Sequence, residues 1–196
     1  MPASGGDPKR LLPEGMAGSN PDWSPDGKLI AFGPQPTFRN TPNVAGRAAS
    51  FSAAIHVLDL KTGKISDLPD SSGLYWPRWS TDGRHIAALS LDTHRLMLFD
   101  NQTRKWTALA SGAALHNPLW SRDGRTLFFQ GLRATGQPVY RLDVESHTQK
   151  RIGGPSAYLR PDSVYSALTG LMPDGSPIIL EIQSVDDIYA LDISFP

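Results

Sequence analysis

Aspartates recur at fixed places along the sequence and are the first residues that could do chemistry. Two carboxylates facing each other across a cleft can hydrolyse glycosides, and a cluster of carboxylates can bind calcium. Each of these aspartates, however, lies before a glycine or at the end of a short apolar run, where a carboxylate usually accepts backbone hydrogen bonds in a turn. A catalytic carboxylate need not recur in every repeat, so we interpret both series as architectural. They are Asp26, Asp82, Asp123 and Asp174, and Asp59, Asp100, Asp143 and Asp192.

Other catalytic or metal-binding patterns are missing from the sequence. It contains no G-x-S-x-G motif for a serine nucleophile, and its five histidines show no H-E-x-x-H spacing. It has no cysteine, which excludes disulfide bonds and thiolate metal ligands. Asn20, Asp22 and Asp26 gather near a glycine but lack the spacing of a calcium-binding loop. We therefore expect no enzymatic activity, no metal and no cofactor.

The composition is typical of a chain made of many short strands. Its 18 glycines and 17 prolines are scattered between short runs of aliphatic and aromatic residues. Nineteen basic residues balance 19 acidic ones, so no overall field attracts nucleic acid or an anionic membrane. No apolar run reaches the roughly 18 residues of a membrane span, and the first residues do not form a signal peptide. We expect a soluble chain without direct nucleic-acid contact, and a cytoplasmic or a periplasmic location is equally compatible with the sequence.

A tryptophan motif divides the chain into similar units. The pattern Trp-Ser-x-Asp-Gly begins at Trp23, Trp79 and Trp120, and a degenerate copy begins at Leu171. Each copy precedes an apolar run, so its Asp-Gly pair predicts a tight β-hairpin, because glycine accepts a positive φ at little cost. A second apolar run and a polar link follow each copy and predict a second hairpin. Four short antiparallel strands in about 40–45 residues are typical of a propeller blade, with the tryptophan packed between neighbouring blades.

The segment N-P-D-W-S-P-D-G-K-L-I-A-F, residues 20–32, resembles the TolB-like (WD-like) repeat of TolB, tricorn-type proteases and prolyl-oligopeptidase propellers. The resemblance spans nearly the whole chain. It implies an all-β fold, a β-propeller of four-stranded antiparallel blades, with about four blades here as part of a six-bladed or larger ring. We expect an outer strand of an incomplete blade at residues 1–15 and blades at residues 16–70, 71–112, 113–155 and 156–196.

The two ends of the sequence leave the size of the ring open. The last repeat reaches only a third strand, and residues 8–12 supply one unpaired outer strand. Pairing of the two would close four blades into a ring. Without that pairing the chain is part of a larger propeller, with an upstream domain of the same protein missing. Residues 171–192 also resemble the last blade of bacterial winged-helix (CadC-like) regulators, which implies a sensory role. The other resemblances imply a peptidase propeller or a TolB-type periplasmic scaffold.

Function is expected where the repeats differ, because the shared residues already hold each blade together. The segments that lead into the innermost strands could line the mouth of the channel and bind a ligand or peptide, or could simply pack between blades. Their residues are Asn20, Asp22, Trp76, Arg78, His116 and Asn117. An insertion in the first repeat carries aromatic and basic side chains suited to a protein partner, although ordinary loop variation also explains it. These residues are Phe38, Arg39, Arg47 and Phe51. We expect a non-catalytic module that binds a protein, peptide or small ligand.

Overall fold

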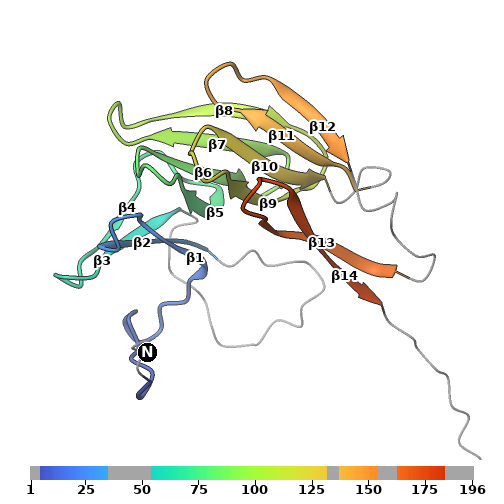
Figure 1. Ribbon diagram of the computed structural model, residues 1–196. Coiled ribbons are helices and arrows are strands. Elements are labelled where there is room, and N and C mark those ends of the chain that lie inside the picture. The colour runs from blue at the N-terminus through green and yellow to red at the C-terminus, as the bar shows by residue number, and fades with distance from the viewer. Residues whose placement is uncertain (1–4, 35–53, 132–136, 154–162, 184–196) are drawn as a thin grey trace, which may run out of the picture.

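The computed structural model describes residues 5–34, 54–131, 137–153 and 163–183. All regular elements in these ranges are β-strands, arranged in four antiparallel sheets that fan out in an arc (Figure 1). Consecutive strands are neighbours within every sheet, so each sheet is a simple meander. No helix capable of crossing a membrane occurs in these ranges. The expected all-β class and antiparallel blade pattern are confirmed.

The sheets are named A to D in chain order. Sheet A contains β1 (Ser19–Trp23), β2 (Leu29–Gly33), β3 (His56–Asp59) and β4 (Ile65–Asp67). Sheet B contains β5 (Leu74–Trp79), β6 (His85–Ser90), β7 (Arg95–Asp100) and β8 (Lys105–Ser111). Sheet C contains β9 (Leu115–Trp120), β10 (Thr126–Gly131), β11 (Val139–Asp143) and β12 (Gln149–Gly153). Sheet D contains β13 (Ser163–Leu171) and β14 (Pro177–Gln183).

The repeated Trp-Ser-x-Asp-Gly motif forms the hairpin between the first and second strands of a sheet. In sheet A the Ser24 hydroxyl donates to Asp26 Oδ1 at 2.7 Å and accepts from the backbone N–H of Leu29 at 2.9 Å. Asp26 Oδ1 also accepts from the backbone N–H of Lys28 at 3.1 Å. Gly27 has a φ of 70°, a conformation that favours glycine. The same bonds form in sheets B and C, at Ser80 with Asp82 and at Ser121 with Asp123.

Both aspartate series therefore serve the turns wherever the structure describes them. In the fourth copy of the motif, Asp174 accepts from the backbone N–H of Ser176 at 2.9 Å. In the second series, Asp59, Asp100 and Asp143 each accept from backbone N–H groups two or three residues further on. Their architectural interpretation is confirmed, and Asp192 lies outside the described residues.

Neighbouring sheets pack through the tryptophan of the motif. At the seam between sheets A and B, Trp79 and Phe99 pack in one apolar cluster with Ala31 and Leu68. At the seam between sheets B and C, Trp120 packs with Leu89 and donates its Nε1 hydrogen to the carbonyl of Arg78 at 2.9 Å. The ring of His85 stacks on Trp120, with centroids 6.3 Å apart. The predicted placement of Trp79 and Trp120 between blades is confirmed.

Leu171 takes the tryptophan's place at the seam between sheets C and D, where it packs with Ile179 and Phe128. The hairpin of sheet D is one residue shorter than the others, because Leu171 pairs with Pro177 where Trp23 pairs with Ile30. The shorter turn shifts the register of β14 by one residue. Ile178 therefore lies on the opposite face of the sheet from the one its place in the sequence repeat would give it.

The described part of the expected outer strand at residues 1–15, residues 5–15, contains no assigned strand, and the outer strand stays a prediction. Two prolines, Pro8 and Pro13, remove backbone donors from this segment, and no described strand pairs with it. Leu12 at the end of this segment and Met16 just after it pack on sheet A. Each described sheet lies inside one of the ranges 16–70, 71–112, 113–155 and 156–196, which stay predictions as blade boundaries.

Candidate binding site at the bulges of the first strands

The first strands of sheets A, B and C each carry a β-bulge at the same place. At each bulge a residue with positive φ precedes a proline: Asn20 with φ 50°, Trp76 with φ 56° and Asn117 with φ 53°. A positive φ is uncommon outside glycine and is strained for a bulky residue such as tryptophan. Bulges re-aim side chains and are frequent beside functional sites. Three equivalent irregularities therefore mark one end of the sheets.

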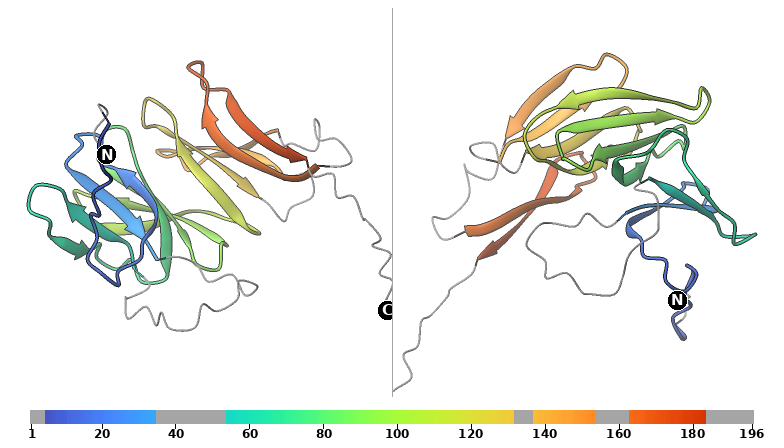
Figure 2. Two further views of the ribbon diagram at one scale, coloured as in Figure 1. Left: turned by 90° about the horizontal axis from the view of Figure 1, so that it is seen from below. Right: turned by 180° about the vertical axis from the view of Figure 1, so that it is seen from behind.

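These bulges are brought near one another because the first strands form the inner edge of the arc. β1 contacts β5, β5 contacts β9 and β9 contacts β13, whereas the outer strands β4, β8 and β12 make few contacts with other sheets. Figure 2 shows the sheets spreading outward from this edge in two further views. The six residues expected at the channel mouth all lie on these first strands.

Asp22 of sheet A and Arg78 of sheet B join the two sheets at this edge. The Asp22 carboxylate accepts from the backbone N–H of Trp79 at 2.6 Å. Arg78 Nη1 donates to the carbonyls of Asn20 at 3.2 Å and Pro77 at 3.0 Å. Burial raises the pKa of Asp22, against the opposing effects of the Trp79 N–H and the Arg78 charge. Burial likewise lowers the pKa of Arg78. Asp22 and Arg78 thus hold two blades together, whatever else they bind.

Sheets B and C meet at an aromatic cluster on the same edge. The Trp76 ring packs edge-on against His116, with centroids 5.8 Å apart and an interplanar angle of 89°. The Arg78 guanidinium carbon lies 5.8 Å from the centre of the Trp76 ring. Tyr75, which is fully buried beside them, has its pKa raised by burial to about 12. The cluster is therefore a cationic and aromatic surface with a neutral phenol behind it.

Buried donors in this cluster have no hydrogen-bond partner among the described residues. They are Trp76 Nε1 and Asn117 Nδ2, and the Tyr75 hydroxyl is unpaired as well. Asn117 is only 9% exposed. A buried donor without an acceptor costs about 1–3 kcal/mol, and such groups usually bind ordered water or a ligand. Trp76 Nε1 and Asn117 Nδ2 have almost no accessible surface, so a molecule that brings acceptors reaches them only where neighbouring side chains move aside.

The structure places all six expected channel-mouth residues along this edge, and their role in binding stays a prediction. Sequence reasoning missed Tyr75, because a buried aromatic beside the motif looks like ordinary core. It also missed the positive φ values, since a residue before proline normally adopts an extended conformation. The insertion residues Phe38, Arg39, Arg47 and Phe51 lie outside the described residues. Across the described ranges, no three potential metal ligands come together.

Four-strand meanders that pack face to face, with their first strands at a common inner edge, define part of a β-propeller. The chain is similar over 88% of its length to TolB from Acinetobacter baumannii, with 24% identity and a TM-score of 0.63. It is similar over 83% of its length to a putative TolB from Agrobacterium tumefaciens, with 19% identity and a TM-score of 0.57. Over 78% it is similar to the β-propeller domain of the Trilobed protease from Pyrococcus furiosus, with 17% identity and a TM-score of 0.51.

These similarities establish the fold, which is that of a partial TolB-like β-propeller. The chain spans 39%, 63% and 45% of the length of those three proteins, respectively. No protein-family model matches the sequence, and comparison with curated proteins gave no match. Activity and partners therefore have to be argued from the residues of this chain.

Proposed function

We propose that this chain is a non-catalytic propeller module that binds an extended segment of a protein partner at the bulges of β1, β5 and β9. The observation that carries the proposal is a pair of buried donors on neighbouring blades, Trp76 Nε1 and Asn117 Nδ2, that have no acceptor among the described residues. A peptide backbone supplies carbonyl acceptors at regular short intervals. A small ligand rich in carbonyl or carboxylate oxygens would satisfy the same donors, so the experiment below uses peptides as the probe.

The surroundings of these donors suit a peptide. The Trp76 ring offers an apolar surface, and Arg78 lies beside it with a positive charge that attracts carbonyl or carboxylate oxygens. The strained backbone at Trp76 and Asn117 is the kind of local cost that persists where a site is preorganised for a ligand. Binding would then satisfy donors that have no partner within the described ranges of the free chain.

A binding role is favoured over catalysis because the acidic groups are already engaged. Asp22 holds the Trp79 N–H, and the recurrent aspartates hold turns. These assignments leave recognition as the chemistry that the edge supports best.

The finer roles expected from the sequence also remain proposals. A sensory module of a bacterial winged-helix regulator, a propeller that gates substrate for a peptidase, and a periplasmic scaffold would each bind a polypeptide at this edge. The similarity to TolB and to a protease propeller supports the last two equally. Whether a bound peptide is held or passed through the centre of the arc distinguishes a scaffold from a gate.

A peptide selection tests the proposed function directly. Random twelve-residue peptides displayed on phage are selected on the immobilised chain, and their affinities are measured for wild type, Trp76→Phe and Asn117→Ala. We expect each variant to weaken binding about tenfold, the equivalent of one hydrogen bond of about 1.4 kcal/mol. Trp79→Phe is the matched control, because Trp79 Nε1 is also buried and unpaired but lies at the seam between sheets A and B. Equal loss in Trp76→Phe and Trp79→Phe, or no selected peptide at all, would refute the proposal.

A further inference from the structure

The repeat contains four Asp-Gly pairs that are chemically alike but are held differently. In such a pair the glycine nitrogen can attack the side-chain carboxyl carbon of the aspartate, because glycine has no side chain to hinder the approach. The carboxyl group must first turn toward that nitrogen, so bonds and contacts that fix the turn slow the reaction. The pairs are Asp26-Gly27, Asp82-Gly83, Asp123-Gly124 and Asp174-Gly175.

In sheets A, B and C a serine anchors the aspartate to the strand that follows. The Ser24 hydroxyl donates to Asp26 and accepts from the backbone N–H of Leu29, the first residue of β2. Ser80 and Ser121 make the same two bonds in sheets B and C. Rotation of these carboxylates toward the glycine nitrogen therefore breaks a hydrogen bond within the hairpin.

Asp174 in sheet D lacks this anchor. Met172 stands at the place of the serine, and a thioether has no hydrogen to donate. The following strand begins with Pro177, which has no backbone N–H. Asp174 accepts from the backbone N–H of Ser176 at 2.9 Å, and the Ser176 hydroxyl adds to this bond. Both donors belong to one residue of the turn, so the carboxylate is tied to the turn and not to the strands.

The turns of sheets B and C are also covered by the turn of the preceding sheet. A side-chain carbon added at Gly124 would lie 2.9 Å from Thr81 Oγ1 in the turn of sheet B. One added at Gly83 would lie 3.7 Å from Pro25 Cδ in the turn of sheet A. At Gly175 no described atom beyond the adjacent residues lies within 4 Å of such a carbon, although the preceding sheet C is present and packs on sheet D. The shorter hairpin therefore separates this turn from its neighbour.

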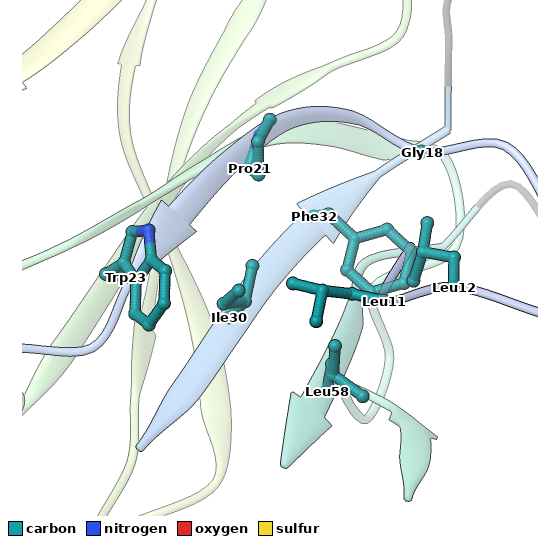
Figure 3. Close-up of a pocket in the computed structure, with 8 residues that line it drawn as sticks. All are labelled: Leu11, Leu12, Gly18, Pro21, Trp23, Ile30, Phe32 and Leu58. Carbon is teal, nitrogen blue, oxygen red and sulfur yellow. The ribbon is translucent and has the colours of Figure 1, made fainter. Parts of the chain in front are cut away.

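Sheet A is an intermediate case. Its Gly27 also has no described atom within 4 Å of an added side-chain carbon. No described sheet precedes sheet A, and its Trp23 lies beside an open apolar pocket of about 280 Å³ (Figure 3). The Ser24 anchor is nevertheless in place. The aspartate of sheet A thus has one of the two restraints, those of sheets B and C have both, and Asp174 has neither.

We propose that Asp174-Gly175 is a site of spontaneous isomerisation, at which the folded chain acquires an isoaspartate. The Gly175 nitrogen bonds to Asp174 Cγ, and its proton leaves with the hydroxyl of the protonated carboxyl group as water, which gives a cyclic succinimide. Water then adds to the Asp174 backbone carbonyl and breaks its bond to the nitrogen, so the chain continues through Cγ. The water lost is replaced by the water added, and the mass of the chain is unchanged.

The product alters the turn that sets the register of β14. Its backbone is longer by one carbon, and the free carboxylate now belongs to the main-chain position of Asp174. The modified turn joins Leu171 to β14, whose Ile179 packs on Phe128 at the seam with sheet C. The reaction therefore acts on one seam and leaves the hairpins of sheets A, B and C intact.

Isoaspartate mapping in the folded full chain tests the site. The chain is incubated at neutral pH for several weeks, and electron-transfer fragmentation of its proteolytic peptides distinguishes isoaspartate from aspartate at the four positions. We expect about tenfold more isoaspartate at Asp174 than at Asp82 or Asp123, which corresponds to about 1.4 kcal/mol in the barrier. Asp26 should lie between them, and it is the matched internal control because both it and Asp174 stand in a Pro-Asp-Gly sequence. In guanidinium chloride the difference should disappear, since anchors and packing are lost.

Two variants separate the anchor from other causes. Ser24→Ala removes the anchor of sheet A, so isoaspartate at Asp26 should rise to the level at Asp174, which itself should not change. Asp174→Glu should abolish the signal at that position, because glutamate would have to close a larger ring. Circular dichroism checks the fold throughout, and the wild-type order decides the proposal even if Ser24→Ala does not fold. Equal isoaspartate at all four positions of the folded chain, a higher level at an anchored turn, or the same order in denaturant would overturn it.

Discussion

Trp79 and Trp23 begin the same five-residue motif but lie in opposite environments. Trp79 packs in the cluster between sheets A and B, and Trp23 stands at the edge of an open apolar pocket. The hairpins that follow them have the same hydrogen bonds between serine, aspartate and backbone. Local chemistry thus builds each hairpin independently of its neighbours, and packing energy is gained only where a second sheet arrives. The motif therefore forms a turn by itself and also presents a tryptophan on which a neighbouring sheet can pack.

The largest expected loss of stability is for a substitution of Trp120, which lies in the seam between sheets B and C. Replacing it with alanine should lower the free energy of unfolding by about 3–5 kcal/mol, because a buried aromatic leaves a cavity. Its bond to the Arg78 carbonyl and its stack on His85 are lost as well. Urea denaturation measures the change. Trp120→Phe sharpens the result, since it keeps most of the ring and should cost about 1 kcal/mol for the hydrogen bond. A loss below about 1 kcal/mol for the alanine variant would place Trp120 outside the seam.

A buried amide offers a second way to break a seam. Gln130 is fully buried, and its side-chain oxygen accepts from the backbone N–H of Leu168 in sheet D at 3.0 Å. Gln130→Ala leaves that N–H unpaired and should cost about 1–3 kcal/mol in urea denaturation. Amide hydrogen exchange at Leu168 should rise more than exchange in sheet A. The control Gln102→Ala, at an exposed turn, should stay within about 0.5 kcal/mol of wild type.

The turn aspartates should give a smaller effect that depends on pH. The hydrogen bond from the Ser24 hydroxyl is the main cause that lowers the pKa of Asp26 from its ordinary 3.8 to about 2, and the Lys28 N–H adds to it. Because the folded pKa is the lower one, the ionised carboxylate stabilises the fold above the unfolded pKa. That contribution is lost as the pH falls through about 2. Thermal unfolding of Asp26→Asn should therefore show a lower Tm than wild type at pH 6, and the difference should shrink at pH 2.

Asp22 supplies the control for that pH dependence, since its environment is the reverse. Burial raises its pKa, so the ionised form costs stability above the folded pKa, and this cost disappears as the pH falls below the ordinary value of 3.8. The difference in Tm between Asp22→Asn and wild type should therefore favour the variant more at pH 6 than at pH 3. If the two asparagine variants followed the same pH profile, the contrast between turn and seam carboxylates would be wrong.

The smallest effect is expected at Trp23 itself. In dilute solution, Trp23→Ala should change the free energy of unfolding by less than about 1 kcal/mol, because more than half of the side chain is in contact with water. The comparison with Trp120→Ala uses the same substitution in the same motif, so it isolates the contribution of the neighbouring sheet. A loss as large as that of Trp120→Ala would show that something in solution covers this face.

Features fixed by neighbouring residues could be predicted from the sequence. Ser24, Asp26 and Gly27 determine their hairpin through bonds that span only a few residues, and the repetition of the motif predicted the meanders and the seam positions. The outer strand expected in residues 1–15 stays a prediction, because a strand also needs a partner, which no local pattern reveals.

The candidate site could be predicted only in part. The differences between repeats pointed to Arg78 and His116, and the structure brings both against Trp76. The unpaired donors at Trp76 and Asn117 arise from the packing of two sheets and from backbone angles that the following prolines disfavour. The shift of β14 depends on one missing residue in a turn, which changes the face of every side chain after it.

The simple meander of each sheet has a consequence for how such molecules change over generations. Each sheet is continuous in sequence and contacts mainly the sheets next to it along the chain. Insertion or loss of one whole unit therefore leaves the remaining interfaces chemically intact, and the number of units can vary faster than the design of any one of them. Duplication of a unit followed by substitutions at the inner edge would therefore change what the edge binds and leave the residues that form the hairpins and seams unchanged.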